Sequence, residues 1–313
     1  MTEETKIVNS YIIPTLNNYS GLLALLDSLE KYTPPNYQVI VINNGHCLPL
    51  TPLGEELIAK IKPKVSIWID PYRNLGFAKS MNTGIQLATT PFCTIANDDV
   101  EVIYDQWWQD TMKLFENDPE LMGFNPHSFI NKAASGDRVQ EYPTKDEYTM
   151  EDIEKMRAFF PKWYVGCCTF FTICKKKLFD EVGLFDENFG IGSGEDYDLM
   201  VRAGRKKYKI AGGSLVMVKH WWGATKDNMP KEVLNGISNY DLIAGGNQNL
   251  TEKWGPHCEE VQRQLKDGRL TEEDAKKFNG GWSVSGQGGP IEPFDKDQDI
   301  YHDKGKWYQT IAL

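Results

Sequence analysis

The first hundred residues alternate between a hydrophobic pattern typical of buried strands and one typical of amphipathic helices. Residues 6–13 are rich in β-branched and aromatic side chains and stop at Pro14, which predicts a buried strand. Leu22, Leu25, Leu26 and Leu29 then follow the i, i+3, i+4, i+7 spacing of a helix that buries one face. The alternation continues, with further strands expected at 38–42, 65–69 and 91–96, and helices at 53–61 and from the turn after 73 to about 88.

This order of elements predicts an α/β fold with a parallel sheet and right-handed crossovers. In such sheets ligands bind beyond the carboxyl ends of the strands. Three of the predicted strands end in polar residues, at Asn17–Asn18, Asn43–Asn44 and Asp70. We therefore expect a binding site at this edge of the sheet.

A polar turn at residues 73–84 precedes the strand at 91–96. Arg73 and Lys79 in this turn would suit a diphosphate or a ribose, and Gly76 lets the backbone approach a ligand closely. Taken alone, such a turn is a weak signal for phosphate binding. Its position directly before the next strand end makes it part of the same expected site.

The strand at 91–96 ends in Asn97, Asp98 and Asp99. Adjacent carboxylates at a strand end suit a hard divalent cation, Mg²⁺ or Mn²⁺, which also takes oxygens from a substrate phosphate. The alternative is that one of the two aspartates caps a following helix. The polar strand ends and the turn nearby favour the metal site.

Composition narrows the class of protein. With 313 residues the chain can bury a sizeable core, and its net charge of −10 argues against a general nucleic-acid binder. Residues 1–6 lack the basic start of a signal peptide, and no apolar run approaches the roughly 18 residues of a membrane helix, so we expect a cytoplasmic protein. The six cysteines show no metal-finger spacing, and we expect reduced, mostly buried thiols.

Several segments resemble family 2 glycosyltransferases, whose GT-A fold is a single Rossmann-like nucleotide-binding domain with a mostly parallel central sheet. The segments occur in the family's order, at residues 11–18, 41–45, 74–77, 82–84, 97–99, 183–189 and 194–199, with Arg202 and His220. The acidic motif at 97–99 begins with Asn, and this variant of the motif resembles the one in the rhamnosyltransferase-like branch. The resemblance implies a catalytic domain at 1–225, followed by a helical and irregular extension at 226–313 that wraps this domain or mediates homo-oligomerisation.

The resemblance implies a donor site for a UDP-, dTDP- or GDP-linked sugar. Asp99 falls on the family's metal ligand, and His220 on a second ligand, although a histidine at a strand end is also a common core residue. Asn97 replaces the first carboxylate of the DXD motif and would contact ribose or phosphate, while Asp98 would either compensate or face solvent. Asn43 replaces an Asp that reads the base, and its amide can still bond a pyrimidine edge. The expected donor-binding residues are Pro14, Thr15, Asn17, Asn43, Arg73, Asn74, Gly76, Asn82, Asn97 and Asp98.

Glycosyl transfer to a hydroxyl needs a carboxylate general base. Glu195 and Asp196 follow the glycine-rich residues 190–194 and open a predicted helix, whose dipole favours their ionised forms. One interpretation is that both are merely acidic residues at the start of a helix. The resemblance implies instead that Asp196 is the base and that Glu195 contacts the acceptor or has a structural role. The sequence offers one candidate base and no second carboxylate that could act as a nucleophile. Together with the resemblance, this predicts that the anomeric configuration is inverted when a hexosyl or deoxyhexosyl group is transferred.

The acceptor side carries aromatic residues. Trp163 and Gly166 occupy the family's acceptor position, and Trp221 and Trp222 would stack on an acceptor sugar, close over the donor or pack as core. Residues 131–156 are polar at first and are interpreted as an insertion over the site that forms an acceptor lid.

Together these patterns predict an inverting glycosyltransferase that depends on Mn²⁺ or Mg²⁺ and acts on a hydroxyl acceptor, a glycan by preference. One alternative is a catalytically degenerate nucleotide-sugar or carbohydrate-binding protein, given Asn43 and Asn97. A nucleotidyltransferase is less consistent with the sequence, because residues 14–20 contain no Gly or Lys for a phosphate loop.

Overall fold

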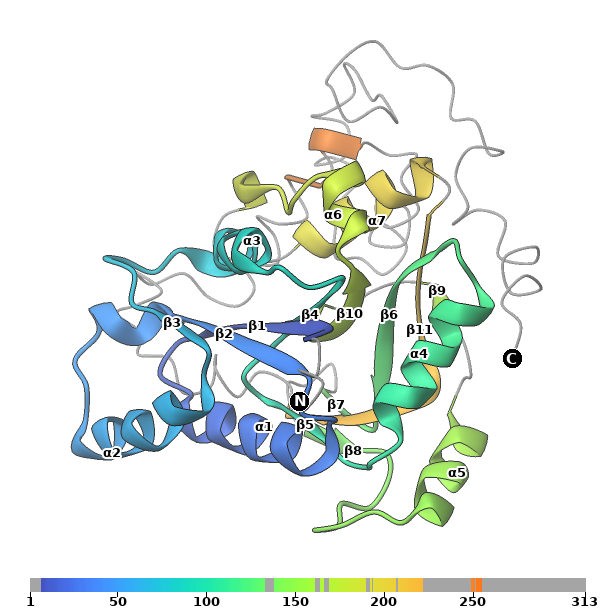
Figure 1. Ribbon diagram of the computed structural model, residues 1–313, viewed down its shortest axis with the longest axis horizontal. Coiled ribbons are helices and arrows are strands. Elements are labelled where there is room, and N and C mark those ends of the chain that lie inside the picture. Colours follow the sequence, from blue (N-terminus) through green and yellow to red (C-terminus); the bar gives the residue numbers. More distant parts are fainter. Residues whose placement is uncertain are drawn as a thin grey trace, which may run out of the picture.

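The structure is a computed structural model that describes residues 7–132, 138–160, 164–165, 169–189, 192, 194–206, 208–221, 249–250 and 252–254. Its centre is a nine-stranded sheet in the order β3-β2-β1-β4-β10-β6-β11-β5, with β9 paired to β11. Helices cover both faces of this sheet (Figure 1).

The N-terminal half of the sheet is parallel. It contains β1 (Asn9–Thr15), β2 (Tyr37–Asn43), β3 (Ile67–Ile69) and β4 (Phe92–Ala96), with β1 between β2 and β4. The connecting helices are α1 (Tyr19–Tyr32), α2 (Pro52–Ile61) and α3 (Gly76–Leu87). The alternation of strands and helices predicted from the sequence is confirmed over this half.

The C-terminal half of the sheet mixes directions. The strand β10 (Phe171–Lys175) runs antiparallel between β4 and β6 (Leu121–Ser128), and β11 (Lys209–His220) is parallel to β6 and antiparallel to β5 (Val100–Val102) and β9 (Tyr164–Val165). Among the described residues, six of the nine strands share one direction and β5, β9 and β10 oppose it. The predicted α/β fold with a mostly parallel sheet is therefore confirmed.

Two local expectations differ from the structure. The first strand continues through Pro14, which is possible because β1 pairs with β4 only up to Ile12, so the proline has no ladder to interrupt on that side. Asp98 and Asp99 are followed by the strand β5, so the helix-cap alternative for them is wrong. The predicted boundary at 225/226 and the helices expected beyond it lie outside the described residues.

Residues 131–156, expected to form an insertion, contain regular structure. The strands β7 (Ile130–Lys132) and β8 (Arg138–Gln140) form a hairpin, and α5 (Met150–Phe159) begins with a capping box between Thr149 and Asp152. The remaining helices are α4 (Trp107–Asn117), α6 (Lys177–Val182) and α7 (Glu195–Arg205). A role for 131–156 as an acceptor lid stays a prediction.

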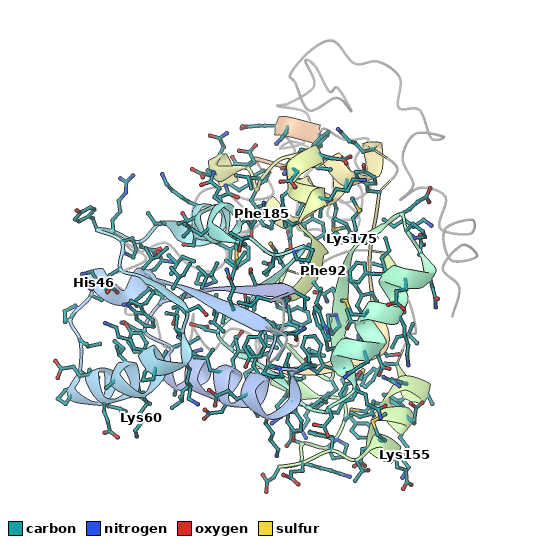
Figure 2. The ribbon with its side chains drawn as sticks, in the orientation of Figure 1. His46, Lys60, Phe92, Lys155, Lys175 and Phe185 are labelled. Carbon is teal, nitrogen blue, oxygen red and sulfur yellow. The ribbon has the colours of Figure 1, made fainter. Side chains whose placement is uncertain are left out.

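Among the described residues, the two larger hydrophobic clusters of the core lie one on each face of the sheet. Alternate residues of β1 belong to different clusters, with Tyr11 and Ile13 beside α1 and Ile12 beside α3. A Cβ on Gly84 would lie 2.3 Å from Cγ2 of Ile12, so α3 packs directly on β1. Figure 2 shows Phe185, a partner of α3, on this second face.

Two further predictions concern the cysteines and the membrane. Cys93 and Cys174 are buried free thiols, and burial raises the pKa of Cys93 to about 12, which makes it a weak nucleophile. No helix among the described residues is long and apolar enough to cross a bilayer.

Candidate functional site

The ends of β1 and β4 are joined through Asp98. Thr15 Oγ1 donates to Asp98 Oδ2 at 2.7 Å, and Asn18 Nδ2 donates to Asp98 Oδ1 at 3.1 Å. Asn18 stands at the N-cap position of α1, but its side chain makes no capping bond and turns to Asp98 instead. Asp98 is only 2% exposed, so the expectation that its carboxylate faces solvent is wrong. Its bonds to Thr15 and Asn18 link the two strand ends.

A second hydrogen-bonded group joins the ends of β2 and β3. The amide of buried Asn43 accepts a bond from Tyr19 Oη at 2.9 Å and donates to Asp70 Oδ1 at 2.8 Å. Trp68 Nε1 also donates to Asp70 Oδ1, at 2.9 Å. His46 Nδ1, on η1 (Asn44–Cys47) after β2, lies 3.6 Å from the same oxygen (Figure 2). Both ends of the Asn43 amide thus make hydrogen bonds, and one of these bonds holds Asp70, whose side chain is 31% exposed.

The turn before α3 is fixed by asparagines. Asn44 Oδ1 accepts from the backbone N of Leu75 at 3.0 Å, and Asn74 Oδ1 accepts from the N of Gly76 at 2.9 Å. Gly76 has φ of +74°, a left-handed conformation that favours glycine. Arg73 is exposed at the start of this turn. The turn therefore has the tight backbone expected of it, with a guanidinium at its outer edge.

Asn17 occupies a special position after β1. Its φ of 62° is left-handed, which asparagine tolerates better than most residues. A Cβ on Gly45 would lie 2.7 Å from Asn17 Oδ1, so the turn after β2 packs tightly on the turn after β1. Asn17 Oδ1 is buried and accepts no hydrogen bond from the described residues. Pro14, half-buried on β1, lies just before this turn.

Asp99 and His220 are brought together by the antiparallel pairing of β5 and β11. His220 is in register with Val100, and the backbone N of Trp221 donates to the carbonyl of Asp99 at 2.8 Å. The side chains meet with His220 Nε2 3.1 Å from Asp99 Oδ1, and each is only 4% exposed. The ring of Phe170 stacks on the imidazole, with centroids 4.3 Å apart and planes at 12°.

This pair fits a divalent cation, because one carboxylate oxygen and one imidazole nitrogen face each other at the end of two strands. Within the part of the chain that the structure describes, no group of three or more His, Cys, Asp and Glu side chains gathers. Of the described residues, Asp99 and His220 would hold the cation, and oxygens of a substrate and water would complete its coordination.

Asn97 lies beside this pair. Its backbone N donates to the carbonyl of Phe170 at 2.7 Å, which ties the end of β4 to the residue that stacks on His220. The side chain of Asn97 is half-buried. Asn97 is thus held next to the Asp99–His220 pair through its backbone.

Glu195 and Asp196 are the first two residues of α7, as predicted. Gly194, with φ of 94°, precedes them, and Asp196 Oδ1 accepts from the backbone N of Tyr197 at 2.9 Å. Glu195 is buried and Asp196 half-buried. A Cβ on Gly192 would lie 3.5 Å from Cβ of Phe77, the second residue of α3. Gly192 therefore lies against α3, the helix that follows the 73–76 turn.

Asn82 and Trp221 are two further predicted site residues whose side chains bond within the protein. Asn82 donates to the carbonyl of Phe185 and to Glu187 Oε1 at 2.9 and 3.0 Å, and accepts from the N of Phe185 at 2.9 Å. Its amide therefore holds the 185–187 segment, and a contact between Asn82 and the donor stays a prediction. Trp221 Nε1 donates to Glu101 Oε1 at 2.6 Å and its ring packs on the first core cluster, as in the core alternative. Trp163, Gly166 and Trp222 lie outside the described residues.

Tyr19, Asp70 and Phe170 are not among the site residues that the sequence predicts. Asp70 does carry a signal, because it is a polar residue that directly follows a predicted strand. Tyr19 and Phe170 carry none, since a lone aromatic beside a hydrophobic segment is indistinguishable from core.

Comparisons with known proteins agree with this geometry. Residues 10–183 match the family described as Glycosyl transferase family 2. A Bacillus subtilis (strain 168) protein named "Uncharacterized glycosyltransferase YwdF" is 25% identical over 210 residues, which are 64% of this chain and 69% of that protein.

Two solved structures are similar in fold. GalNAc-T7, solved with UDP, GalNAc and Mn²⁺, has a TM-score of 0.57 at 15% identity, over 98% of this chain and 58% of that one. The mannosyltransferase PcManGT from Pyrobaculum calidifontis, in complex with GDP-Man and Mn²⁺, has a TM-score of 0.50 at 12% identity, over 88% and 84%. This chain thus spans little more than half of GalNAc-T7, and at these identities the likeness shows the fold. Since the family match covers more than half of the 313 residues, the chain belongs to glycosyl transferase family 2 and is a glycosyltransferase with a GT-A fold.

Proposed function

We propose that the chain is an inverting glycosyltransferase that requires a divalent cation and transfers a sugar from a nucleotide-sugar donor to a hydroxyl acceptor. The observation that carries this proposal is the Asp99–His220 pair, with 3.1 Å between Oδ1 and Nε2, at the same sheet edge as the polar ends of β1 to β4. The Mn²⁺ in the GalNAc-T7 and PcManGT complexes supports the choice of a divalent cation.

Asp99 and His220 would hold the cation. When bound, it would offset the negative charge that grows on the leaving diphosphate. A nitrogen ligand favours Mn²⁺ over Mg²⁺, because Mg²⁺ prefers oxygen ligands. The exposed guanidinium of Arg73, on the turn before α3, would add positive charge toward the phosphates.

Asp70 is the group that we propose to read the donor base, in place of Asn43. A carboxylate only accepts hydrogen bonds, so it pairs with a ring N–H. Uracil, thymine and guanine offer such an N–H, whereas the ring nitrogen of cytosine is an acceptor. Donors linked to UDP, dTDP or GDP are therefore favoured over those linked to CMP. The buried amide of Asn43 orients Asp70 through the 2.8 Å bond to its Oδ1.

Asp196 would act as the general base, and Glu195 would contact the acceptor or support the helix start. In a single displacement the acceptor oxygen bonds to the sugar's anomeric carbon, the bond to the diphosphate breaks, and Asp196 takes the hydroxyl proton. One base suffices for this inverting route. Asn97, at the first position of the acidic motif, supports a hexosyl or deoxyhexosyl donor of the rhamnosyltransferase-like branch.

Thermal unfolding with UDP-, dTDP-, GDP- and CMP-sugars, with and without Mn²⁺, tests the proposal. A ligand at 100 times its Kd adds about 2.7 kcal/mol, which raises the unfolding temperature of a chain of this size by roughly 4–6 °C. We expect one nucleotide class to stabilise the wild type only with Mn²⁺, and Asp99→Asn to abolish this shift. Asp105→Asn, the same change at an exposed residue just after β5, should leave it intact. Absence of any shift in folded wild type would favour a degenerate site instead.

A further inference from the structure

The 249–254 segment, of which the structure describes 249, 250 and 252–254, lies beyond the part of the chain that matches the family. It packs beside α7, where Figure 1 draws it in orange next to α6 and α7. Leu250 and Trp254 are 0% and 2% exposed and form a small cluster with Phe189, to which Tyr197 of α7 contributes. Asn249 Nδ2 donates to the carbonyl of Asn188 at 3.0 Å.

The strongest contact of this segment is with Asp198, three residues after the start of α7. Asp198 is completely buried, and a buried carboxylate is tolerated only when it is paired and hydrogen-bonded. Its Oδ2 accepts from Arg202 Nε at 2.9 Å, whereas its Oδ1 takes its partners from the segment, Trp254 Nε1 at 2.8 Å and Lys253 Nζ at 2.7 Å. The segment therefore completes the ion pair inside the first turns of α7.

Lys253 makes a second ion pair, with Asp186 Oδ2 at 2.6 Å. Asp186 precedes the 190–194 loop and Asp198 follows it, so one ammonium group ties both sides of the loop together. The loop contains Gly192 and Gly194, with φ of 153° and 94°, and glycines confer little conformational restriction of their own. The ion pairs of Lys253 with Asp186 and Asp198 therefore help to fix the position of Glu195 and Asp196 at the start of α7.

We propose that Lys253 and Trp254 are positioning residues that hold the first turn of α7, and with it Asp196, in the geometry needed for proton abstraction. This inference rests on the proposed function, in which Asp196 is the general base. In this role the two residues of the 249–254 segment support the active site through α7 and have no direct contact with the substrates. Their loss should lower the rate of transfer and spare donor binding, because the donor edge is built from β1 to β4.

The test compares Lys253→Met and Trp254→Phe with the full-length wild type. Matched controls are Lys60→Met, at an exposed lysine of α2, and Trp108→Phe, at a buried tryptophan of the first core cluster. Hydrogen exchange of the amides at 186–205 and steady-state transfer are measured on each protein, with the nucleotide sugar that stabilises the wild type. Lys253→Arg, which keeps the cation, serves as the rescue variant.

We expect both test variants to exchange faster at 186–205 than the wild type, with unchanged exchange in β1 to β4. Their kcat should fall about 10- to 100-fold with donor KM unchanged, because small displacements of a reacting group have effects of this size. The controls should keep the wild-type kcat, and Lys253→Arg should recover most of it.

Unchanged exchange at 186–205, or an unchanged kcat, would overturn the proposal, as would a rise in donor KM alone. The exchange measurement needs no activity, so it reports on the docking of the segment even if the proposed function fails. A wild type that transfers no sugar with any nucleotide donor refutes the proposed function and the positioning role together. In that case faster hydrogen exchange at 186–205 in the variants would still show that the 249–254 segment stabilises α7.

Discussion

The carboxyl ends of β1 to β4 and the start of α7 both carry site residues, but different forces hold them in place. At the strand ends, continuous parallel pairing sets the positions of Thr15 and Asn43, which are in register with each other. Short side-chain bonds such as Thr15 to Asp98 then add to a backbone that is already fixed. The first turn of α7 is held in addition by the buried carboxylate of Asp198, which pairs with Arg202 on the same helix and with Lys253 of the 249–254 segment.

This difference indicates that donor binding and the rate of transfer can be changed independently by substitutions in the two regions. A side chain lost at the strand ends leaves the sheet pairing intact, so the donor edge should survive most single substitutions there. A side chain lost around Asp198 leaves a buried charge without its partner, and the first turn of α7 should shift. The four predictions below test this contrast, beginning with the largest effect.

Asp196→Asn should lower kcat by about 10²- to 10⁴-fold, the usual contribution of a general base. Donor affinity should not change, because Asp196 lies on α7 and the donor edge lies on the strands. Steady-state kinetics together with donor titration in the presence of Mn²⁺ would measure both quantities. An equal loss in donor affinity and kcat would show that the two regions are not independent.

Asp198→Ala should destabilise the fold by about 3–5 kcal/mol, because it leaves Arg202 and Lys253 without the buried carboxylate that pairs with them. Urea denaturation gives the free energy of unfolding. Asp180→Ala, at an exposed aspartate of α6, is the control and should change it by no more than about 0.5 kcal/mol. Similar losses in the two variants would contradict the role of the buried pair.

Asp70→Asn should weaken binding of the favoured nucleotide by about tenfold, the value of one charge-assisted hydrogen bond of roughly 1.5 kcal/mol. Binding of CMP-sugars should weaken less, since an amide can donate to the ring nitrogen of cytosine. Calorimetric titration of each protein with each nucleotide, in the presence of Mn²⁺, measures the ratio of the dissociation constants of variant and wild type. If the loss is the same for every base, Asp70 does not read the base.

The smallest effect concerns pH. Burial acts to raise the pKa of Asp186, but hydrogen bonds from Lys253 and Asn188 outweigh it and hold the pKa below its usual value of 3.8. Because the folded-state pKa is the lower one, the stabilisation by Asp186 is fully present above about pH 4 and is lost as the pH falls through the folded-state value. Urea denaturation between pH 3 and 7 should therefore give a larger free energy of unfolding for wild type than for Asp186→Asn. This difference should be constant from pH 5 upward and should narrow below pH 4. A difference that widens on acidification would contradict this assignment.

Much of the donor edge could be predicted from the sequence. Hydrophobic periodicity located the first four strands, and the polar residues at their ends followed from the rule for parallel sheets. The Asp98 case shows the limit of this reasoning, because the two adjacent aspartates are equivalent in sequence. Only the packing showed that Asp98 turns to Thr15 and Asn18, whereas Asp99 turns to His220.

What the sequence determined by itself was therefore local: the strand and helix alternation, the α/β class and the acidic strand end, all of which depend on neighbouring residues and short periods. What the tertiary structure decided was long-range. It brought His220 to Asp99 across 121 positions and Trp254 to Asp198 across 56. Contacts of this kind depend on how strands from different halves of the chain pair and on which charges share a buried space. A single sequence carries no periodic signal for either.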